Sequence, residues 1–363
     1  MDRRIWHNYD FVLLGATFLL LVYGIAMIYS ASHTTGSVSD SALRQAIFAV
    51  AGLVVGLAVT AIDYRLLDAF SVPLYVFIVL LLFAVFLIGQ ITFNVRRSIH
   101  LGIIDLQPSE LSKPLMVIVL AAFLSKMEGK PSQLPALLLS SLLVAVPVFL
   151  IYKEPDLGTS LVLVFIWLTM VFAWGTRLLY LGLLFGVGIA AIPLAWLSME
   201  NYMRRRVATF FNPASDPQSY YNIRQALYAI GSGGWFGKGY LKGTQSQLHF
   251  LLVKHTDFVF SVLCEELGIV GALLLFALFA TVLLRTLAAA KLARDTFGRL
   301  ICTGIAAWIF FQSAVSIGMN LNLLPVTGLP LPFVSYGGSS LMTLLAAMGL
   351  IQSVLLRHRR IEF

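Results

Sequence analysis

Residues 255–284 read HTDFVFSVLCEELGIVGALLLFALFATVLL, and the second half of this segment is apolar enough to cross a lipid bilayer. A hydrophobic run of about 20 residues has the length of a transmembrane helix. Three carboxylates, those of Asp257, Glu265 and Glu266, stand where the run begins. The segment therefore predicts a membrane-spanning helix that carries ionisable groups near one of its ends.

The rest of the chain has the same apolar character. Its 363 residues are 59% hydrophobic and 12% charged, which leaves too little polar surface for a soluble domain. The apolar runs are continuous and not alternating, so they exclude a strand barrel and predict an all-α polytopic membrane protein. The first run lacks the cleavage site of an export signal, so we expect it to stay as a span. About ten spans are expected, near residues 10–29, 43–62, 71–91, 108–126, 133–151, 156–174, 178–198, 258–284, 300–320 and 338–356.

The distribution of Lys and Arg predicts the orientation of these spans. An even number of spans places both termini on one side, and short loops rich in Lys and Arg face the cytoplasm. We therefore expect cytoplasmic termini and one large extracytoplasmic loop, residues 199–257, within a single domain that covers residues 1–363. The net charge of +8 then reflects topology and membrane lipids, not nucleic acid. On the N-terminal side lie Arg3, Arg4, Arg65, Lys126, Lys130, Arg177, Arg285, Lys291, Arg294, Arg299, Arg357, Arg359 and Arg360; Arg44, Arg96, Arg97 and Lys153 lie opposite.

Nucleotide and metal chemistry have no motif in this sequence. The stretch GSGGWFGKG (231–239) lacks the GxxxxGK[ST] spacing of a phosphate-binding loop, and we interpret it as a flexible turn after a short amphipathic helix, YNIRQALYAI. Cys264 and Cys302 both fall in spans without metal or redox spacing. A reaction catalysed here must draw its energy from the substrate itself.

Charged groups in or beside spans are costly, so each is a candidate for structure or function. In QPSELSKP (107–114), Pro108 suits a helix start, Glu110 and Lys113 can pair at i and i+3, and Pro114 is expected to kink the helix. This pair could be structural or could serve a substrate. In KEPDLGTS (153–160), Asp156 is expected to cap the next helix, which explains most of its placement.

Two further stretches belong to the expected outer loop and its end. In MRRRVATFFNP (203–213), the arginines could hold a diphosphate or face lipid headgroups. If a helix begins near Thr256, then Asp257, Ser261 and Glu265 recur at four-residue steps on one face. Asp257 would then lie at the outer interface, either stabilised by the helix dipole or free for chemistry.

Five stretches in order resemble the SEDS family (shape, elongation, division and sporulation), which comprises peptidoglycan polymerases. They are QPSELSK, PDLGTS, GSGGWFGKGYLKGTQSQ, HTDFVFSVLCEELG and PVTGLPLPFVSYGGSS (325–340), and the resemblance runs from the first span to the C-terminus. The wording GTQSQL before HTDF is more similar to the elongation member, RodA, than to the division member, FtsW.

The resemblance implies polymerisation of lipid II at the outer face of the bacterial cytoplasmic membrane. It implies a class B penicillin-binding protein (a transpeptidase) as partner, together with lipid II, the growing lipid-linked glycan, elongation-complex membrane proteins and membrane lipids. It implies that Asp257 is catalytic. The residues expected to bind substrate or support the site are Glu110, Lys113, Arg97, Arg204, Arg206, Asp156, Gln245, Ser261 and His255.

The chemistry of glycan synthesis fits these residue types. A sugar hydroxyl needs a positioned carboxylate as general base, and a departing lipid diphosphate needs cationic stabilisation. Arginine, lysine or a divalent cation (Mg²⁺ or Mn²⁺) could supply it, although no metal site is certain from the sequence. Two other classes stay open at this point: a lipid II flippase, because many spans carry buried charges, and a scaffold that only recruits a partner.

Overall fold

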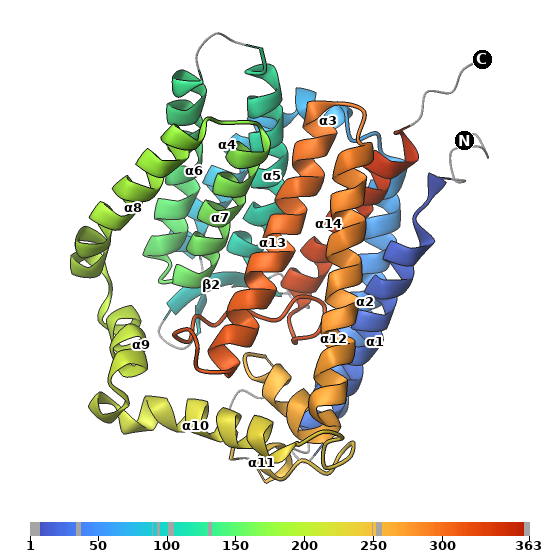
Figure 1. Cartoon of the computed structure of the whole chain (residues 1–363), viewed down its shortest axis with the longest axis vertical. Helices are drawn as coiled ribbons and strands as arrows, with labels where there is room; N and C mark the ends of the chain where they lie inside the picture. The colour runs from blue at the N-terminus through green and yellow to red at the C-terminus, as the bar shows by residue number, and fades with distance from the viewer. Residues whose placement is uncertain are drawn as a thin grey trace.

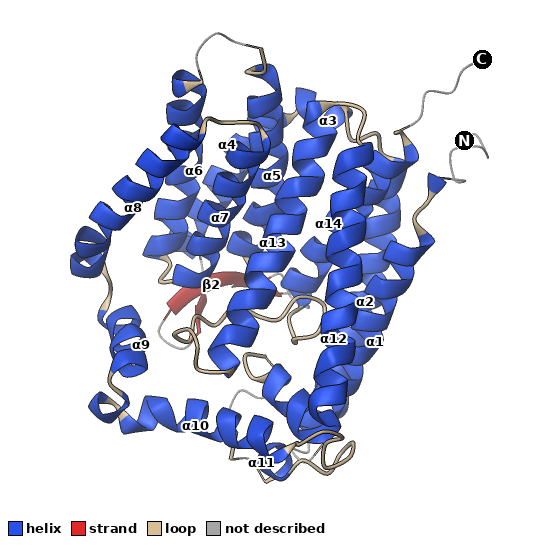
Figure 2. Ribbon diagram, in the orientation of Figure 1, coloured by secondary structure: helices blue, strands red, loops and turns tan. Residues whose placement is uncertain are grey.

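A computed structural model describes residues 8–33, 38–88, 90–92, 95–100, 105–129, 133–248, 250–251 and 256–358. Within these residues, eight helices are long and apolar enough to span a membrane, and two shorter apolar helices cover residues 71–87 and 157–173. The expected all-α polytopic membrane fold is thereby confirmed (Figures 1 and 2). The ten helices are α1 (Phe11–Ser32), α2 (Val38–Ala61), α4 (Ser71–Ile88), α5 (Pro108–Lys126), α6 (Leu134–Lys153), α7 (Leu157–Ala173), α8 (Leu178–Ser198), α12 (Val259–Leu292), α13 (Thr296–Asn320) and α14 (Gly338–Leu356).

Burial separates the inner helices from the outer ones. In α5, α13 and α14, 78%, 78% and 83% of the apolar window is buried, whereas none of α8 is. Helix α8 accordingly lies at the edge of the bundle (Figure 1). Because α5 and α13 also carry polar residues, the centre of the bundle is where buried polar groups can find one another.

Glycine permits the closest helix crossing, between α2 and α14. A Cβ on Gly349 would lie 2.1 Å from the carbonyl oxygen of Gly56. Gly52 and Gly56 have the small-xxx-small spacing that lets membrane helices approach closely. Thr60 strengthens the crossing, because its hydroxyl donates to the carbonyl of Gly349 at 3.1 Å.

The start of α1 and the end of α14 lie at one end of the bundle (Figure 1). The main-chain N–H of Asp10 donates to Gln352, and the Gln352 amide donates back to the Asp10 carbonyl. The Asp10 carboxylate also pairs with Arg285 at 2.7 Å. Residues 199–248 lie at the opposite end and contain α9 (Asn201–Phe211), the 3₁₀ helix η2 (Pro213–Ser215), α10 (Pro217–Ser232) and α11 (Thr244–Gln247). The expected amphipathic helix YNIRQALYAI is part of α10.

A small sheet between α4 and α5 was not predicted. It comprises β1 (Gln90–Thr92), β2 (Val95–His100) and β3 (Asp105–Leu106), in the antiparallel order β1-β2-β3 (Figure 2). The expected third span, residues 71–91, is therefore too long, since α4 ends at Ile88. Averaged hydropathy cannot separate a three-residue strand from the apolar helix before it. The short helix α3 (Leu66–Ala69) was likewise not predicted.

The segment that joins α13 to α14, residues 321–337, returns into the bundle and is not an exposed turn. Its side chains Leu329, Leu331, Phe333 and Val334 are all at most 2% exposed. A Cβ on Gly24 of α1 would lie 2.7 Å from the Phe333 carbonyl oxygen, so this backbone packs directly on a helix. Irregular backbone at membrane depth is tolerated where protein surrounds it. We call residues 321–337 the re-entrant loop.

Candidate active site

Asp257 lies in the turn Thr256–Phe258, directly before α12. The expected helix start near Thr256 is wrong, because the main chain at Phe258 (φ −112°, ψ 22°) is not helical and α12 begins at Val259. Ser261 and Glu265 do belong to the helix, but Asp257 does not extend their face. A turn gives Asp257 no intrahelical hydrogen bonds to fix it, so its position depends on tertiary contacts.

Two side chains from other elements hold the main chain around Asp257. The amide nitrogen of Asn320, the last residue of α13, donates to the Asp257 carbonyl at 2.9 Å. The hydroxyl of Ser335, in the re-entrant loop, donates to the Thr256 carbonyl at 2.6 Å. Both consecutive carbonyls of the turn are thus bonded to buried side chains.

Asn320 is fully buried, and both ends of its amide are used. Its oxygen accepts from the Ser261 hydroxyl at 2.7 Å and from the Ser261 N–H at 3.3 Å. Its nitrogen also donates to the Ser316 carbonyl at 2.8 Å. The side chain therefore fastens the turn of Asp257 and the first turn of α12 to the end of α13. Ser261 therefore has a structural contact at this junction.

Arg206 approaches Asp257 across Gly328 of the re-entrant loop. A Cβ on Gly328 would lie 3.4 Å from Nη1 of Arg206 and 3.8 Å from Oδ2 of Asp257. Gly328 has φ 75°, a backbone conformation that favours glycine. The guanidinium of Arg206 also donates to the Val326 carbonyl at 3.2 Å and lies over the Tyr202 ring at 4.4 Å. A carboxylate and a guanidinium therefore both lie within 4 Å of one point beside this glycine.

A pocket opens beside Arg206. Arg206 lines it, and so does Thr327, which precedes Gly328. The pocket thus gives a ligand access to the cationic side of the site. Its lining combines α9, the start of α7 and the re-entrant loop: Pro155, Leu157, Tyr202, Met203, Arg206, Val207, Pro325, Val326 and Thr327.

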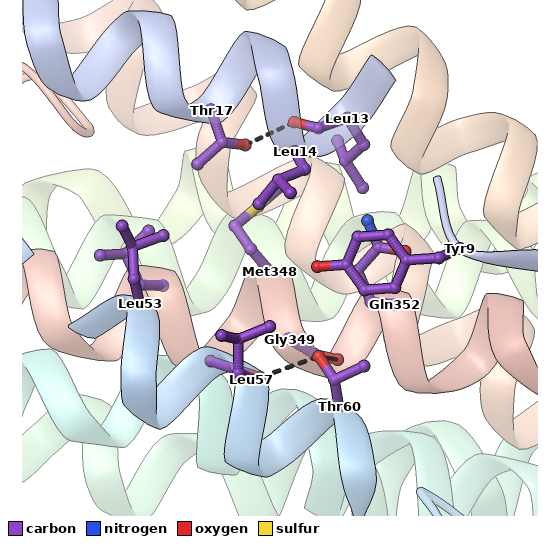
Figure 3. A pocket seen from close by; sticks show the side chains of 12 residues that line it. Tyr9, Leu13, Leu14, Thr17, Leu53, Leu57, Thr60, Met348, Gly349 and Gln352 are labelled. Carbon is purple, nitrogen blue, oxygen red and sulfur yellow. Dashed lines mark hydrogen bonds between the residues drawn. The ribbon is translucent and has the colours of Figure 1, made fainter. Parts of the chain in front are cut away.

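A larger pocket, about 360 Å³, lies elsewhere, between α1, α2 and α14 (Figure 3). Thr17 and Thr60 on its wall donate their hydroxyls to main-chain carbonyls of their own helices. Gln352 has both ends of its amide bonded to Asp10. Apart from these residues and Tyr9 the wall is apolar, and it contains neither a carboxylate nor a cation. Size alone therefore does not identify the reaction site.

The expected pair of Glu110 and Lys113 forms deep inside the bundle. Nζ of Lys113 donates to Oε1 of Glu110 at 2.6 Å, and both residues are at most 2% exposed. The same ammonium donates to Oε1 of Gln312 at 2.9 Å and lies 5.3 Å from the centre of the Trp308 ring. The second oxygen of Glu110, Oε2, has no hydrogen-bond partner among the described residues. Pro108 occupies the first turn and Pro114 stays within continuous α5.

Gln312 connects this pair to the re-entrant loop. Its amide oxygen accepts from Lys113 and from the Trp308 indole, the latter at 2.7 Å. Its amide nitrogen donates to the Pro330 carbonyl at 2.8 Å. Pro330 is two residues from Gly328, so the ion pair supports the part of the re-entrant loop that lies beside Arg206 and Asp257. Buried polar groups that are joined in this way specify one arrangement of the surrounding backbone.

Glu265 and Glu266 hold the segment 238–247, which we call the strap. Glu265 accepts from the Lys238 ammonium at 2.8 Å and from the main-chain N–H groups of Gln245 and Ser246. Glu266 accepts from the Ser30 hydroxyl, 2.5 Å from its Oε1, and from the Leu241 N–H at 3.2 Å. These carboxylates are fully buried and have structural partners. Glu265 and Glu266 therefore join the strap to α12, and Glu266 also joins it to α1.

Tyr240 attaches the strap to α1. Its hydroxyl donates to the Ala26 carbonyl at 2.9 Å. Burial, followed by the nearby Glu266 carboxylate and Tyr29, raises the pKa of Tyr240 above its usual value. The hydroxyl therefore keeps the proton that this hydrogen bond requires.

Several expected site residues lie apart from Asp257 or are occupied otherwise. Arg204 is two residues from Arg206, but its guanidinium donates to the carbonyls of Trp196 and Leu197 at the end of α8. The two arginines therefore do not form one diphosphate clamp. Asp156 caps α7, as expected: its two oxygens accept from the N–H and hydroxyl of Thr159, each at 3.0 Å.

The remaining expected residues contribute little to the described geometry. Gln245 uses its main-chain N–H to bind Glu265, while its side-chain oxygen is buried without a described partner. Arg97 lies in β2, but its side chain is outside the described residues, and so is the whole of His255. In the described part of the chain, no three His, Cys, Asp or Glu side chains gather to form a metal site.

Sequence reasoning missed four residues that shape the site: Asn320, Ser335, Gln312 and Gly328. A polar amide near the end of an apolar span is a weak signal, because such residues occur in many helices. The run PVTGLPLPFVSYGGSS was noticed as a motif, yet nothing in its pattern indicated that it returns into the bundle.

The sequence matches a known protein family. Residues 11–360 match the model of the FtsW/RodA/SpoVE family, described as cell cycle protein. The peptidoglycan glycosyltransferase MrdB of Escherichia coli K12 is 39% identical over 337 residues, which cover 92% of this chain and 90% of MrdB. A probable peptidoglycan glycosyltransferase FtsW of Trichlorobacter lovleyi is 37% identical over 359 residues, 96% of this chain and 93% of that protein.

Solved structures agree with the sequence relatives. A chain from a peptidoglycan synthase complex that coordinates polymerization and crosslinking has a TM-score of 0.83, with 31% identity and coverage of 96% of this chain and 98% of that one. The crystal structure of the rod shape determining protein RodA of Thermus thermophilus has a TM-score of 0.73, with 32% identity and 97% coverage of both chains.

The fold and its relatives define a membrane-embedded glycosyltransferase of peptidoglycan synthesis. The chain belongs to the FtsW/RodA/SpoVE family, which is the SEDS family expected from the motifs. The expected enzyme class is confirmed, and the wording that favoured the elongation members agrees with the MrdB and RodA matches.

Proposed function

We propose that this protein polymerises lipid II into glycan strands during cell elongation, with Asp257 as the general base. The observation that carries the proposal is that Asp257 and Arg206 both approach the Cβ position of Gly328, beside the pocket lined by Arg206. A base and a cation at one site are what glycosyl transfer to a hydroxyl requires.

In the proposed reaction, the 4-hydroxyl oxygen of the acceptor GlcNAc attacks the anomeric carbon of the donor. The new C–O bond forms as the bond from that carbon to the diphosphate oxygen breaks, with inversion at the anomeric carbon. The hydroxyl proton passes to the Asp257 carboxylate, and the lipid diphosphate leaves with the bonding electrons. Arg206 would stabilise the charge that develops on the diphosphate, because a guanidinium matches phosphate geometry. Lys113, Arg97 and Arg204 have no described contact with this site.

The proposed location is the bacterial cytoplasmic membrane, with the site on its extracytoplasmic side. Residues 199–257 would form the large outer loop, and both termini would be cytoplasmic. Support comes from the arginine- and lysine-rich short loops on the side of the termini. Asp257 directly precedes α12, and α9–α11 lie at the end of the bundle opposite the start of α1 (Figure 1). Long loops are translocated largely regardless of their charge, so the arginines of α9 are compatible with this orientation.

The proposed partner is a class B penicillin-binding protein, which would cross-link the strands made here. The match to a synthase complex that couples polymerization and crosslinking supports it. Lipid II, the lipid-linked glycan product, other elongation-complex membrane proteins and membrane lipids complete the proposed set of partners.

The proposed activity can be tested with the purified protein in liposomes that contain fluorescent lipid II. A ladder of glycan products on a gel, digestible by a muramidase, is the expected result. Transfer of lipid II between leaflets without a ladder would instead identify a flippase. Neither product nor transfer in the presence of the transpeptidase would identify a scaffold.

A further inference from the structure

Helix α12 is interrupted at Gly268, and residues 233–239, which we call the turn, pack against the interruption. Gly268 has φ 64° and ψ −160°, which breaks the helix near its first third. The N–H groups of Lys238 and Gly239 donate to the carbonyls of Glu265 and Glu266, at 2.9 and 3.0 Å. In the other direction, the N–H groups of residues 269 and 270 donate to the carbonyls of residues 234 and 235, at 3.0 and 3.1 Å. The turn thus satisfies the backbone groups that the break leaves unpaired.

Glycine allows this contact, so the turn is held rigidly and is not the flexible turn expected from its composition. A Cβ on Gly237 would lie 2.1 Å from the carbonyl oxygen of Glu266. A Cβ on Gly233 would lie 1.9 Å from that of Cys264. The turn therefore cannot rotate or withdraw without losing main-chain hydrogen bonds.

The rigid turn presents two large aromatic side chains outward. Trp235 is 67% exposed and Phe236 is 82% exposed. The carbonyl of Trp235 accepts from the Val270 N–H, and that of Gly234 accepts from the Ile269 N–H. Ile269 and Val270 are 45% and 48% exposed and begin the outward apolar face of α12. Four residues after Ile269 in α12, Leu273 is 57% exposed. The aromatic tip and this helix face therefore form one apolar surface.

We propose that Trp235 and Phe236 insert into the interfacial region of the lipid bilayer and anchor the outer segment to the membrane surface. The occupant is phospholipid, because the tip continues the face of a membrane span, which lipid covers by default. Aromatic residues are enriched at the membrane–water boundary, where their rings lie at headgroup level. Exposed Lys242, in the strap, adds a cation of the kind that attracts anionic headgroups.

Anchoring has a mechanical consequence for the strap. The last two residues of the turn are the first two of the strap, residues 238–247. Glu265 and Glu266 hold the strap against the first part of α12. Insertion of the tip would therefore fix the height of this segment, and of α12 between Val259 and Gly268, relative to the lipid headgroups. This inference concerns membrane contact alone and holds whatever reaction the site performs.

Spin labels can measure the depth of the tip in the intact protein. Cys264 and Cys302 are buried, so a label on Phe236→Cys can be introduced selectively, with the unmodified protein as the blank. Leu273→Cys serves as the lipid-exposed reference, and Gln218→Cys, at an exposed polar position of α10, serves as the water-exposed reference. Each variant is reconstituted alone into phosphatidylglycerol and phosphatidylethanolamine vesicles. Collision rates with oxygen and with a water-soluble nickel chelate are then compared.

The expected result is an oxygen-to-nickel collision ratio at residue 236 that is several-fold higher than at residue 218 and shifted toward that at residue 273. A ratio equal to that at residue 218 would mean that the tip stays in water and would overturn the proposal. Low collision rates with both reagents would mean that protein covers the tip, which would also overturn it. Glycan synthesis is not part of the readout, so the outcome is independent of the proposed catalytic roles.

Discussion

The side-chain amide of Asn320 donates to the main-chain carbonyl of Asp257 at 2.9 Å, while its oxygen accepts from Ser261. One residue at the end of α13 therefore sets the turn that carries the proposed base relative to the helix that follows it. The side chain is fully buried, so water cannot replace its hydrogen bonds.

Asn320→Asp should lower the rate of glycan polymerisation much more than it raises the KM for lipid II. The carboxylate keeps the oxygen that accepts from Ser261 but lacks the N–H groups that bind the carbonyls of Ser316 and Asp257. A displacement of about 1 Å in a reacting group can cost about 100-fold in rate. Steady-state kinetics with fluorescent lipid II measure the changes in kcat and in KM separately. Wild-type kcat with a raised KM would assign Asn320 to binding instead of positioning.

Arg206→Gln should reduce polymerisation by about 100-fold, the usual effect of removing one group that stabilises a developing anion. Arg204→Gln is the matched variant: it removes the same charge two residues away, from the carbonyls at the end of α8. We expect a much smaller loss of rate for this control. Equal losses of rate in the two variants would indicate that α9 acts through its overall positive charge and not through the position of Arg206.

The two members of the buried ion pair should differ in their effect on stability. Lys113→Met leaves the Glu110 carboxylate buried without a cation, which typically costs about 3–5 kcal/mol. Glu110→Gln leaves Lys113 with an amide oxygen at residue 110 and with Gln312, so its cost should be smaller. Thermal unfolding of the purified variants in detergent measures the difference. A larger loss of stability in Glu110→Gln would contradict this account of the network.

Gly237→Ala should destabilise the protein by about 1–3 kcal/mol, the usual cost of overpacking. The added methyl group would collide with the Glu266 carbonyl, and φ at this residue is 75°. Gly231→Ala is the control, since nothing lies within 4 Å of its Cβ position and its φ is not positive. Unfolding temperatures of the two variants should therefore differ. Similar values would show that the turn can move away from α12.

The sequence was sufficient to predict the helical spans because their signal, continuous apolar runs, is local. It also predicted the Glu110–Lys113 pair and the Asp156 cap, since both join residues three apart in one helix. Contacts between segments far apart in the chain could not be predicted from the sequence. The approach of Arg206 to Asp257 depends on Gly328, 71 residues further along the chain than Asp257, and the partners of Glu265 depend on how the strap folds back. Small strands and the true start of α12 depend on tertiary hydrogen bonds that no local pattern records.

The most direct test of the account is glycan synthesis by Asp257→Asn in liposomes that contain lipid II. Asparagine keeps the size of the side chain and the main-chain bond to Asn320 but cannot accept the hydroxyl proton. Asp10→Asn, at the opposite end of the bundle, is the control for loss of a carboxylate, because asparagine also caps a helix well. The account predicts no polymer from Asp257→Asn, an unfolding temperature close to that of the wild type, and a normal ladder from Asp10→Asn. Polymerisation by Asp257→Asn at a near-normal rate would contradict the assignment of Asp257 as the base.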